Sequence, residues 1–320
     1  MRFLITLCMD SIYLAVPAFI IGILFLYKGS DILVDGTSKT AIKLGISSLI
    51  ISVVVVGFGT SAPEFAISVG AAIQNQPDIS LGNIVGSCIA NLLLVLGIGA
   101  IINPIKIKKG VLKREYPIVI NTTIVLFVFS IIGLLDKFHI VGGVIFLILS
   151  IVIIIYFIKR GKEEQIECEV NDRKGIWKNI LFIILGIVGV VAGAWLLIDS
   201  SITIAEFFGI PSIVIALSMV AIGTSLPELV VSAMAAYREN DDIAIGNVVG
   251  SNIFNIFLIL GFAALFIPLN AFVSLDHIII LLGITFVMIP IFYFGKTISR
   301  LKGVLLLIFY SCFIWYIFFF

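Results

Sequence analysis

Apolar residues run along this chain in long stretches that are separated by short polar segments. A stretch of about 20 apolar residues can cross the hydrocarbon core of a bilayer as one helix. Because the apolar residues are continuous and do not alternate, the pattern favours membrane helices over barrel strands. We predict ten crossings, at about Ser11–Val34, Ile46–Ile73, Ile79–Ile102, Pro117–Leu135, Ile140–Ile158, Trp177–Ile198, Ile210–Tyr237, Ile243–Ile267, Phe272–Phe294 and Leu301–Phe320.

Composition agrees with this pattern. Of 320 residues, 61% are hydrophobic and 12% are charged, whereas about 25% are charged in an ordinary soluble domain. Together with a mean hydropathy of +1.25, these values exclude a soluble globular protein, a disordered chain and a disulfide-stapled secreted module. The net charge of +1 provides no field that would recruit nucleic acid. The four cysteines are far apart and form no C-x-x-C pair, so they indicate neither a zinc site nor a disulfide framework.

The basic residues predict the orientation. Ten crossings place alternate loops on opposite sides, and one side then carries 17 Lys and Arg residues while the other carries Arg2 and Lys137. Since basic loops face the cytoplasm, we expect a multi-pass protein of the cell membrane with both termini outside. No small-residue cleavage pattern follows the first apolar run, so we interpret it as a membrane helix and not as a signal peptide.

The chain also contains an internal repeat. Adding 164 to a residue number aligns residues 57–97 with residues 221–261 without a gap, with 20 identities in 41 positions. The register extends outward to about five helices, so residues 1–158 form the first repeat and residues 177–320 the second. An odd number of crossings inverts the second copy, as in secondary transporters, whose site lies near the bilayer midplane. We therefore predict an all-α polytopic membrane protein of two inverted five-helix repeats, with residues 159–176 as a cytoplasmic linker.

Two acidic residues lie deep inside apolar runs. Of 19 acidic residues, 17 fall in loops or near segment ends, whereas Glu64 and Glu228 do not, and the repeat relates them. An ionised carboxylate at that depth costs at least about 2.5 kcal/mol, so partners must compensate it. Polar residues at helical spacing provide four stripes that can converge on one site. The stripes are Thr60, Glu64, Ser68; Asn83, Ser87, Asn91; Thr224, Glu228, Ser232; and Asn247, Ser251, Asn255.

Each glutamate follows a proline, Pro63 or Pro227, which cannot donate a hydrogen bond to the carbonyl four residues earlier. We expect both prolines to break or loosen their helices and to release backbone carbonyls at the depth of the site. A cage of carboxylate, hydroxyl and amide oxygens suits a hard cation such as Ca²⁺ and argues against zinc or copper.

Structural roles are the alternative for several of these residues. Ser and Asn often only bond across helices, which is an equal alternative for the group Ser68, Ser232, Asn83 and Asn247. For the two glutamates the alternative is a protonated, hydrogen-bonded structural acid. The serines of the stripes have no nearby His or Lys base, and the chain has no H-E-x-x-H motif. We therefore predict no enzymatic activity and no cofactor.

At these residues the sequence resembles the sodium/calcium exchanger family of the cation/Ca²⁺ antiporter superfamily, in its prokaryotic ten-helix form. The resemblance lies in G-T-S-A-P-E (59–64) with G-N-I-V-G-S-C-I-A-N (82–91), and in G-T-S-L-P-E (223–228) with G-N-V-V-G-S-N-I-F-N (246–255). These motifs look like the two alpha repeats of the family, and the likeness in layout covers essentially the whole chain. It implies ion coordination by the side chains of Thr60, Ser61, Glu64, Ser87, Asn91, Thr224, Ser225, Glu228 and Ser251, and by the backbone carbonyls of Gly57 and Ala221.

The resemblance implies a secondary active antiporter that exchanges Na⁺ for Ca²⁺ by alternating access around Glu64 and Glu228. A Ca²⁺/H⁺ antiporter that uses the same glutamates is the alternative, and a cation channel is a further one. The family often has Asp at the position of Asn255, so the amide here leaves coupling to H⁺ or K⁺ and the ion stoichiometry open. We also expect the helices that follow the prolines to hold the site while a less polar bundle with the first and sixth helices slides past it.

Overall fold

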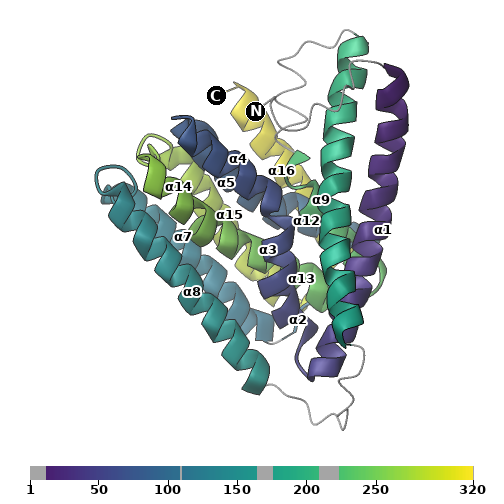
Figure 1. Ribbon diagram of the computed structural model, residues 1–320. Helices are drawn as coiled ribbons and strands as arrows, with labels where there is room; N and C mark the ends of the chain where they lie inside the picture. Colours follow the sequence, from purple (N-terminus) through teal and green to yellow (C-terminus); the bar gives the residue numbers. More distant parts are fainter. Residues whose placement is uncertain (1–11, 109, 164–175, 209–222, 320) are drawn as a thin grey trace.

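The structure, a computed structural model, describes residues 12–108, 110–163, 176–208 and 223–319. Long helices lie side by side in one bundle, and the chain passes from one end of the bundle to the other and back (Figure 1). In the first half the elements are α1 (Ile12–Leu44), α2 (Ser48–Ile51), η1 (Ser52–Val56), α3 (Gly57–Thr60), α4 (Ala62–Ile73), α5 (Pro77–Ala90), η2 (Asn91–Val95), α6 (Leu96–Ile102), β1 (Ile105–Lys106), η3 (Val111–Glu115), α7 (Tyr116–Ile131) and α8 (His139–Glu163), where η denotes a π-helical segment. In the second half they are α9 (Ile176–Phe207), α12 (Leu226–Tyr237), α13 (Asp241–Ile253), η5 (Phe254–Ile259), α14 (Leu260–Phe266), α15 (Leu275–Tyr293), β2 (Thr297–Ile298) and α16 (Arg300–Phe319).

The observed helices follow the predicted crossings. Eight continuous helical runs in the described chain are long and apolar enough to cross a membrane, and the bent run from Ser48 to Ile73 provides a ninth. Of the predicted crossing Ile210–Tyr237, the structure describes α12, and residues 210–222 lie outside the described part. Most of the predicted linker, residues 164–175, is also outside it, so the boundaries of the two repeats stay a prediction.

The first and sixth helices are longer than predicted. The sequence interpretation ended them at Val34 and Ile198, where polar residues begin, but α1 continues to Leu44 and α9 to Phe207. Each extension has a face of buried small side chains, among them Thr37 on α1 and Ser200 on α9. Helix α1 is terminated by the residue after Leu44, Gly45, whose φ of +65° favours glycine. The N–H groups of Gly45 and Ile46 bond back to the carbonyls of Ile42 and Ala41, which is the Schellman pattern of helix termination.

Helices α1 and α9 form a tightly packed pair at one edge of the bundle (Figure 1). Glycines on the facing sides let the two backbones approach, as in small-xxx-small contacts. A Cβ atom at Gly29 would lie 2.8 Å from the backbone N of Val190, and one at Gly193 would lie 2.7 Å from the backbone N of Leu26. Real side chains do not tolerate such distances, so this pair depends on glycine.

The Gly29→Ala variant is therefore expected to be less stable than the unmodified protein. Overpacking of this kind costs about 1–3 kcal/mol. The measurement is the thermal unfolding midpoint of the purified protein in detergent. Gly283→Ala on α15 is the matched control, because no atom lies within 4 Å of a Cβ at that position. Equal midpoints for the two variants would contradict the close packing of α1 on α9.

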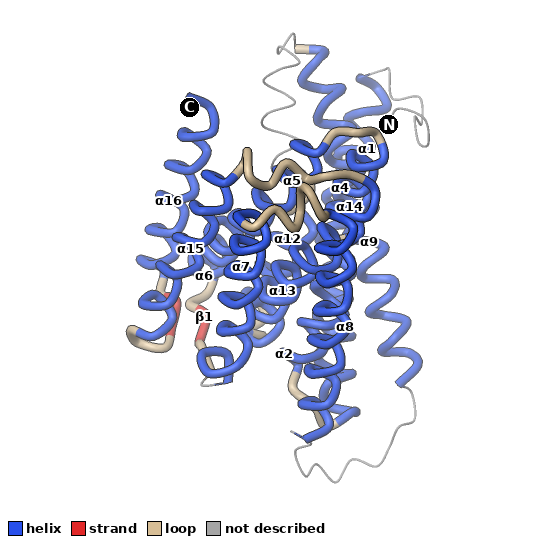
Figure 2. The backbone as a smooth tube through the Cα atoms, turned by 90° about the vertical axis from the view of Figure 1, so that its left-hand side faces the viewer, coloured by secondary structure: helices blue, strands red, loops and turns tan. Residues whose placement is uncertain are grey.

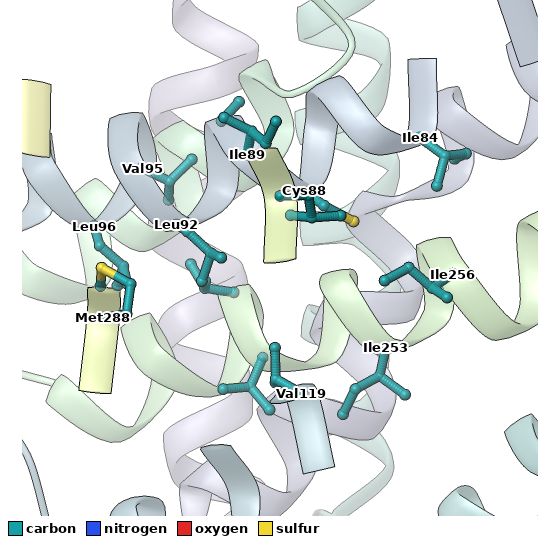
Figure 3. Close-up of a cluster of buried hydrophobic side chains, with 14 of the residues drawn as sticks. Ile84, Cys88, Ile89, Leu92, Val95, Leu96, Val119, Ile253, Ile256 and Met288 are labelled. Carbon is teal, nitrogen blue, oxygen red and sulfur yellow. The ribbon is translucent and has the colours of Figure 1, made fainter. Parts of the chain in front are cut away.

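The two halves of the chain interleave. Helix α8 packs on α14, and α6 packs on α16, so elements of different halves share one hydrophobic core. Figure 3 shows part of this core, to which Ile89 and Leu92 of the first half and Ile253 and Ile256 of the second all belong. A short antiparallel ribbon of β1 and β2 also joins the halves at one end of the bundle (Figure 2). The sequence interpretation did not predict this ribbon.

Candidate ion-binding site

The second predicted crossing is broken at the site. The run Ser48–Thr60 and the run Ala62–Ile73 meet at an angle of 48°, as the prediction for Pro63 requires. Pro63 lies in the first turn of α4, where a missing N–H costs nothing. Pro227 has the same place in the first turn of α12, and Ser225 precedes that helix just as Ser61 precedes α4. Residues 209–222 lie outside the described part, so the bend between the two half-helices is measured only in the first repeat.

The two glutamates occupy the first turns of these half-helices. Glu64 belongs to the first turn of α4 and Glu228 to that of α12. Both side chains are completely buried. The N-terminus of a helix is the positive end of its dipole and stabilises a carboxylate. The break in each helix therefore lowers the free-energy cost of burying the charge of its glutamate. Among the described residues, neither glutamate forms an ion pair.

Serines of both repeats hold one oxygen of each glutamate. Ser61 donates to Glu228 Oε1 at 2.9 Å, and Ser225 donates to Glu64 Oε1 at 3.5 Å. Ser251 donates to Glu228 Oε1 at 3.2 Å, and Ser87 donates to Glu64 Oε1 at 3.4 Å, in the mirrored arrangement. Each acid is thus bonded to the serine before its partner's half-helix and to a serine of the following helix in its own repeat. The pattern obeys the shift of 164 residues.

The second oxygen of each glutamate has no hydrogen-bond partner in the described part of the chain. Glu64 Oε2 and Glu228 Oε2 are buried and make no hydrogen bond to any described residue. An unpaired buried polar atom costs about 1–3 kcal/mol, and more when it is charged. A cation bound next to both oxygens would offset the free-energy cost of burying them without hydrogen bonds.

Threonines and a backbone carbonyl complete the oxygen cluster. Thr60 Oγ1 donates to Asn247 Oδ1 at 3.0 Å and lies 3.4 Å from Ser251 Oγ. Thr224 Oγ1 makes the mirrored contacts in the other half of the cluster, at 3.4 Å to Asn83 Oδ1 and 3.5 Å to Ser87 Oγ. The carbonyl of Gly57 accepts from Ser251 Oγ at 3.2 Å. Ala221, the predicted counterpart of Gly57, lies outside the described residues.

Gly57 lies where two helices cross closely, and this crossing brings its carbonyl within hydrogen-bond distance of Ser251. A Cβ at Gly57 would lie 2.8 Å from the backbone N of Ser251, and one at Gly250 would lie 2.3 Å from the carbonyl oxygen of Val53. The crossing therefore requires glycine on both helices. It packs the run η1–α3 of the first repeat directly on α13 of the second.

Two further asparagines brace the half-helices. Asn83 Nδ2 donates to Ser68 Oγ at 2.8 Å and to the carbonyl of Glu64 at 3.4 Å. The mirrored asparagine, Asn247, donates to Ser232 Oγ at 3.0 Å and to the carbonyl of Glu228 at 3.1 Å. Because these amide groups and hydroxyls are bonded within the protein, this geometry favours the structural alternative for all four residues.

The last pair of predicted ligands stands at π-helical segments. Asn91 begins η2, and Asn255 is the second residue of η5. Such segments are rare and are frequent at functional sites. Asn91 Oδ1 and both amide atoms of Asn255 are buried without a partner among the described residues. Asn252, which the sequence interpretation did not select, also reaches the cluster and accepts from Asn91 Nδ2 at 3.2 Å.

The assembled site is a closed cage of oxygen atoms. Apart from Asn83, which is partly exposed, each predicted side-chain ligand that the structure describes is at most 3% exposed, so the cage is almost entirely buried. Its ligands are carboxylates, hydroxyls, amides and a carbonyl, which hard cations prefer. No group of three or more His, Cys, Asp and Glu side chains that could hold a metal occurs in the described chain. The cluster combines neutral oxygens with two carboxylates, a donor set that suits a hard cation.

Comparisons with known proteins agree with this geometry. The family model described as sodium/calcium exchanger protein matches residues 14–159 and 178–319. The sodium/calcium exchanger MaX1 of Methanosarcina acetivorans is 35% identical over 92% of this chain and 96% of its own length. An uncharacterized membrane protein of Methanocaldococcus jannaschii is 36% identical over 93% and 96%.

A solved structure shows the same fold. The sodium-calcium exchanger NCX_Mj, soaked with zero Na⁺ and Ca²⁺, superposes with a TM-score of 0.84 at 34% identity. The match covers 94% of this chain and 98% of the other. It confirms the predicted all-α polytopic membrane fold of about ten helices, and the family model falls into the two halves that the repeat predicts.

Proposed function

Because the chain belongs to the sodium/calcium exchanger family, we propose that it is a secondary active antiporter that exchanges Na⁺ for Ca²⁺ at the buried oxygen cage. The observation that carries the proposal is the pair of unpartnered oxygens, Glu64 Oε2 and Glu228 Oε2. The described residues donate hydrogen bonds to only one oxygen of each carboxylate, so a cation is needed to compensate the other oxygen. A Ca²⁺ ion or several Na⁺ ions would do this with the same ligands.

The closed cage supports obligate exchange. With two carboxylates and no basic partner, an empty cage would carry close to two negative charges through a state that excludes water. Moving such a charge through a low-dielectric interior is expensive. Only the loaded cage would then change sides readily, so transport of one ion in one direction requires return of the other.

The packing indicates which part moves. Helices α1 and α9 contact each other far more extensively than they contact the rest of the bundle, and they supply none of the predicted ligands. We infer that this pair slides past the half-helices that hold the cage and exposes it to each side in turn, as one bundle moves against another in carriers of this kind.

The arrangement of the ends supports the predicted orientation. The described start of α1 and the end of α16 lie at one end of the molecule, and the end of α8 and the start of α9 lie at the other (Figure 1). Under the positive-inside rule, we place the first of these ends outside the cell and residues 159–176 in the cytoplasm. The repeats would then be residues 1–158 and 177–320.

The direct test uses the purified protein in liposomes. Liposomes loaded with Na⁺ and diluted into Na⁺-free buffer are expected to accumulate radioactive Ca²⁺, and collapsing the Na⁺ gradient is expected to stop the uptake. Uptake that follows an imposed pH gradient and ignores Na⁺ would instead identify a Ca²⁺/H⁺ antiporter. Single-channel currents in a planar bilayer would identify a channel, and either result would overturn the proposal.

A further inference from the structure

The two buried amides of the cage are anchored differently. Asn91 and Asn255 correspond under the shift of 164 residues, and so do Cys88 and Asn252. Asn91 Nδ2 donates to Asn252 Oδ1 at 3.2 Å. The mirrored bond would join Asn255 to residue 88, where the chain has a thiol instead of an amide. Accordingly, neither amide atom of Asn255 has a hydrogen-bond partner among the described residues.

The thiol of Cys88 does not replace the missing amide. It is fully buried, contacts the backbone carbonyl of Asn252 at 3.9 Å and also lies within reach of the Asn255 side chain. A thiol is a weak donor and a weak acceptor, so it cannot hold an amide as a second amide does. Cys88 otherwise lies among apolar side chains such as Ile84 and Ile89 (Figure 3).

Anchoring decides which atom of an amide a cation meets. The bond from Asn91 Nδ2 to Asn252 uses the amide nitrogen and leaves Asn91 Oδ1 free, as a cation ligand must be. The terminal torsion of a weakly held Asn is broad and roughly two-fold, and Asn255 makes no hydrogen bond of normal geometry to a described residue, so it presents oxygen or nitrogen to the cage. A cation that binds the amide oxygen of Asn255 must first fix this torsion. The entropy lost in this ordering lowers the affinity of the cage for the cation.

We propose that Cys88 tunes the cation affinity of the cage because its thiol holds Asn255 less firmly than an amide would, and that Asn252 is the positioning residue that anchors Asn91. The inference rests on the proposed function, since it concerns the same cage. It assigns the difference between the two repeats at positions 88 and 252 to ion affinity and not to packing alone.

The test measures equilibrium binding of radioactive Ca²⁺ to the purified protein, with and without competing Na⁺. Cys88→Asn introduces the missing anchor and is expected to tighten Ca²⁺ binding by about two- to tenfold, from the usual cost of ordering one side chain. Asn252→Cys removes the existing anchor and is expected to weaken binding by a similar factor. Cys88→Ala removes the thiol without adding an amide and is the control, with unchanged affinity expected.

The double variant Cys88→Asn/Asn252→Cys separates positioning from packing. It exchanges the anchors between the repeats and is expected to bind Ca²⁺ about as tightly as the unmodified protein, which a pair of packing defects would not do. Equal affinities for Asn252→Cys and the unmodified protein would overturn the inference, even if Cys88→Asn fails to fold. An equal shift in Cys88→Ala and Cys88→Asn would also overturn it. Absence of Ca²⁺ binding and of Na⁺-driven uptake in the unmodified protein would instead refute the proposed function itself.

Discussion

Replacing Glu228 with Gln is expected to abolish Na⁺-driven Ca²⁺ uptake while the protein still folds. The substitution keeps the size of the side chain and an acceptor for Ser61 and Ser251, which bond to Oε1. It removes one of the two negative charges and places an N–H group in the cage. Loss of one member of a buried charge pair costs about 2–5 kcal/mol, so Ca²⁺ binding should weaken by at least about thirtyfold.

Glu64→Gln is expected to have the same effect, because Glu64 makes the mirrored contacts with Ser87 and Ser225. Initial rates of Ca²⁺ uptake into Na⁺-loaded liposomes measure both variants. Glu206→Gln near the end of α9 is the matched control, since its side chain is exposed and the same charge is lost away from the cage. Undiminished uptake in either cage variant would show that the assigned glutamate is not a ligand.

The sequence alone located most of the candidate site, and the internal repeat is the reason. Glu64 and Glu228 could be selected because an acid inside an apolar run is expensive, and the repeat marked the same position twice. The stripes through Ser87 and Ser251 followed from helical spacing. Asn252 was missed because the candidate ligands were selected as polar residues that occur at the same position of both repeats. The counterpart of Asn252 in the first repeat is Cys88, which is not such a residue. The spacing of Asn252, three residues before Asn255 and inside an apolar run, would have placed it on the same helix face.

The fold was predictable wherever apolar runs decide it. The crossings and the break at Pro63 followed from run length and from the missing N–H of proline. The true ends of α1 and α9 did not, because small and polar residues are buried there by a partner helix that no local pattern reveals. The π-helical segments at Asn91 and Asn255 depend on the backbone register within a packed bundle, and the ribbon of β1 and β2 depends on contact between distant loops.

Two ion pairs in the structure offer a test of the sliding motion. Asp31 on α1 pairs with Arg238, which follows α12, so this pair joins the proposed moving helices to the helices that hold the cage. Lys108, which follows β1, pairs with Asp242 of α13 at 2.6 Å, and both of these residues belong to the part that we propose stays in place. Cysteines at either pair can be joined through two reducible disulfide bonds by a short bifunctional methanethiosulfonate reagent, because the original side chains span the gap.

In a background without the four native cysteines, crosslinked Asp31→Cys/Arg238→Cys protein is expected to lose Na⁺-driven Ca²⁺ uptake and to recover it when the crosslink is reduced. A carrier whose moving pair is tied to its fixed part can bind ions but cannot present them to both sides. Crosslinked Lys108→Cys/Asp242→Cys protein should retain the rate of its uncrosslinked form, which excludes a general effect of the reagent. Full uptake by the first crosslinked protein would contradict movement of α1 relative to α12. The cage would then have to open by motion of the half-helices themselves, about the bend at Ser61.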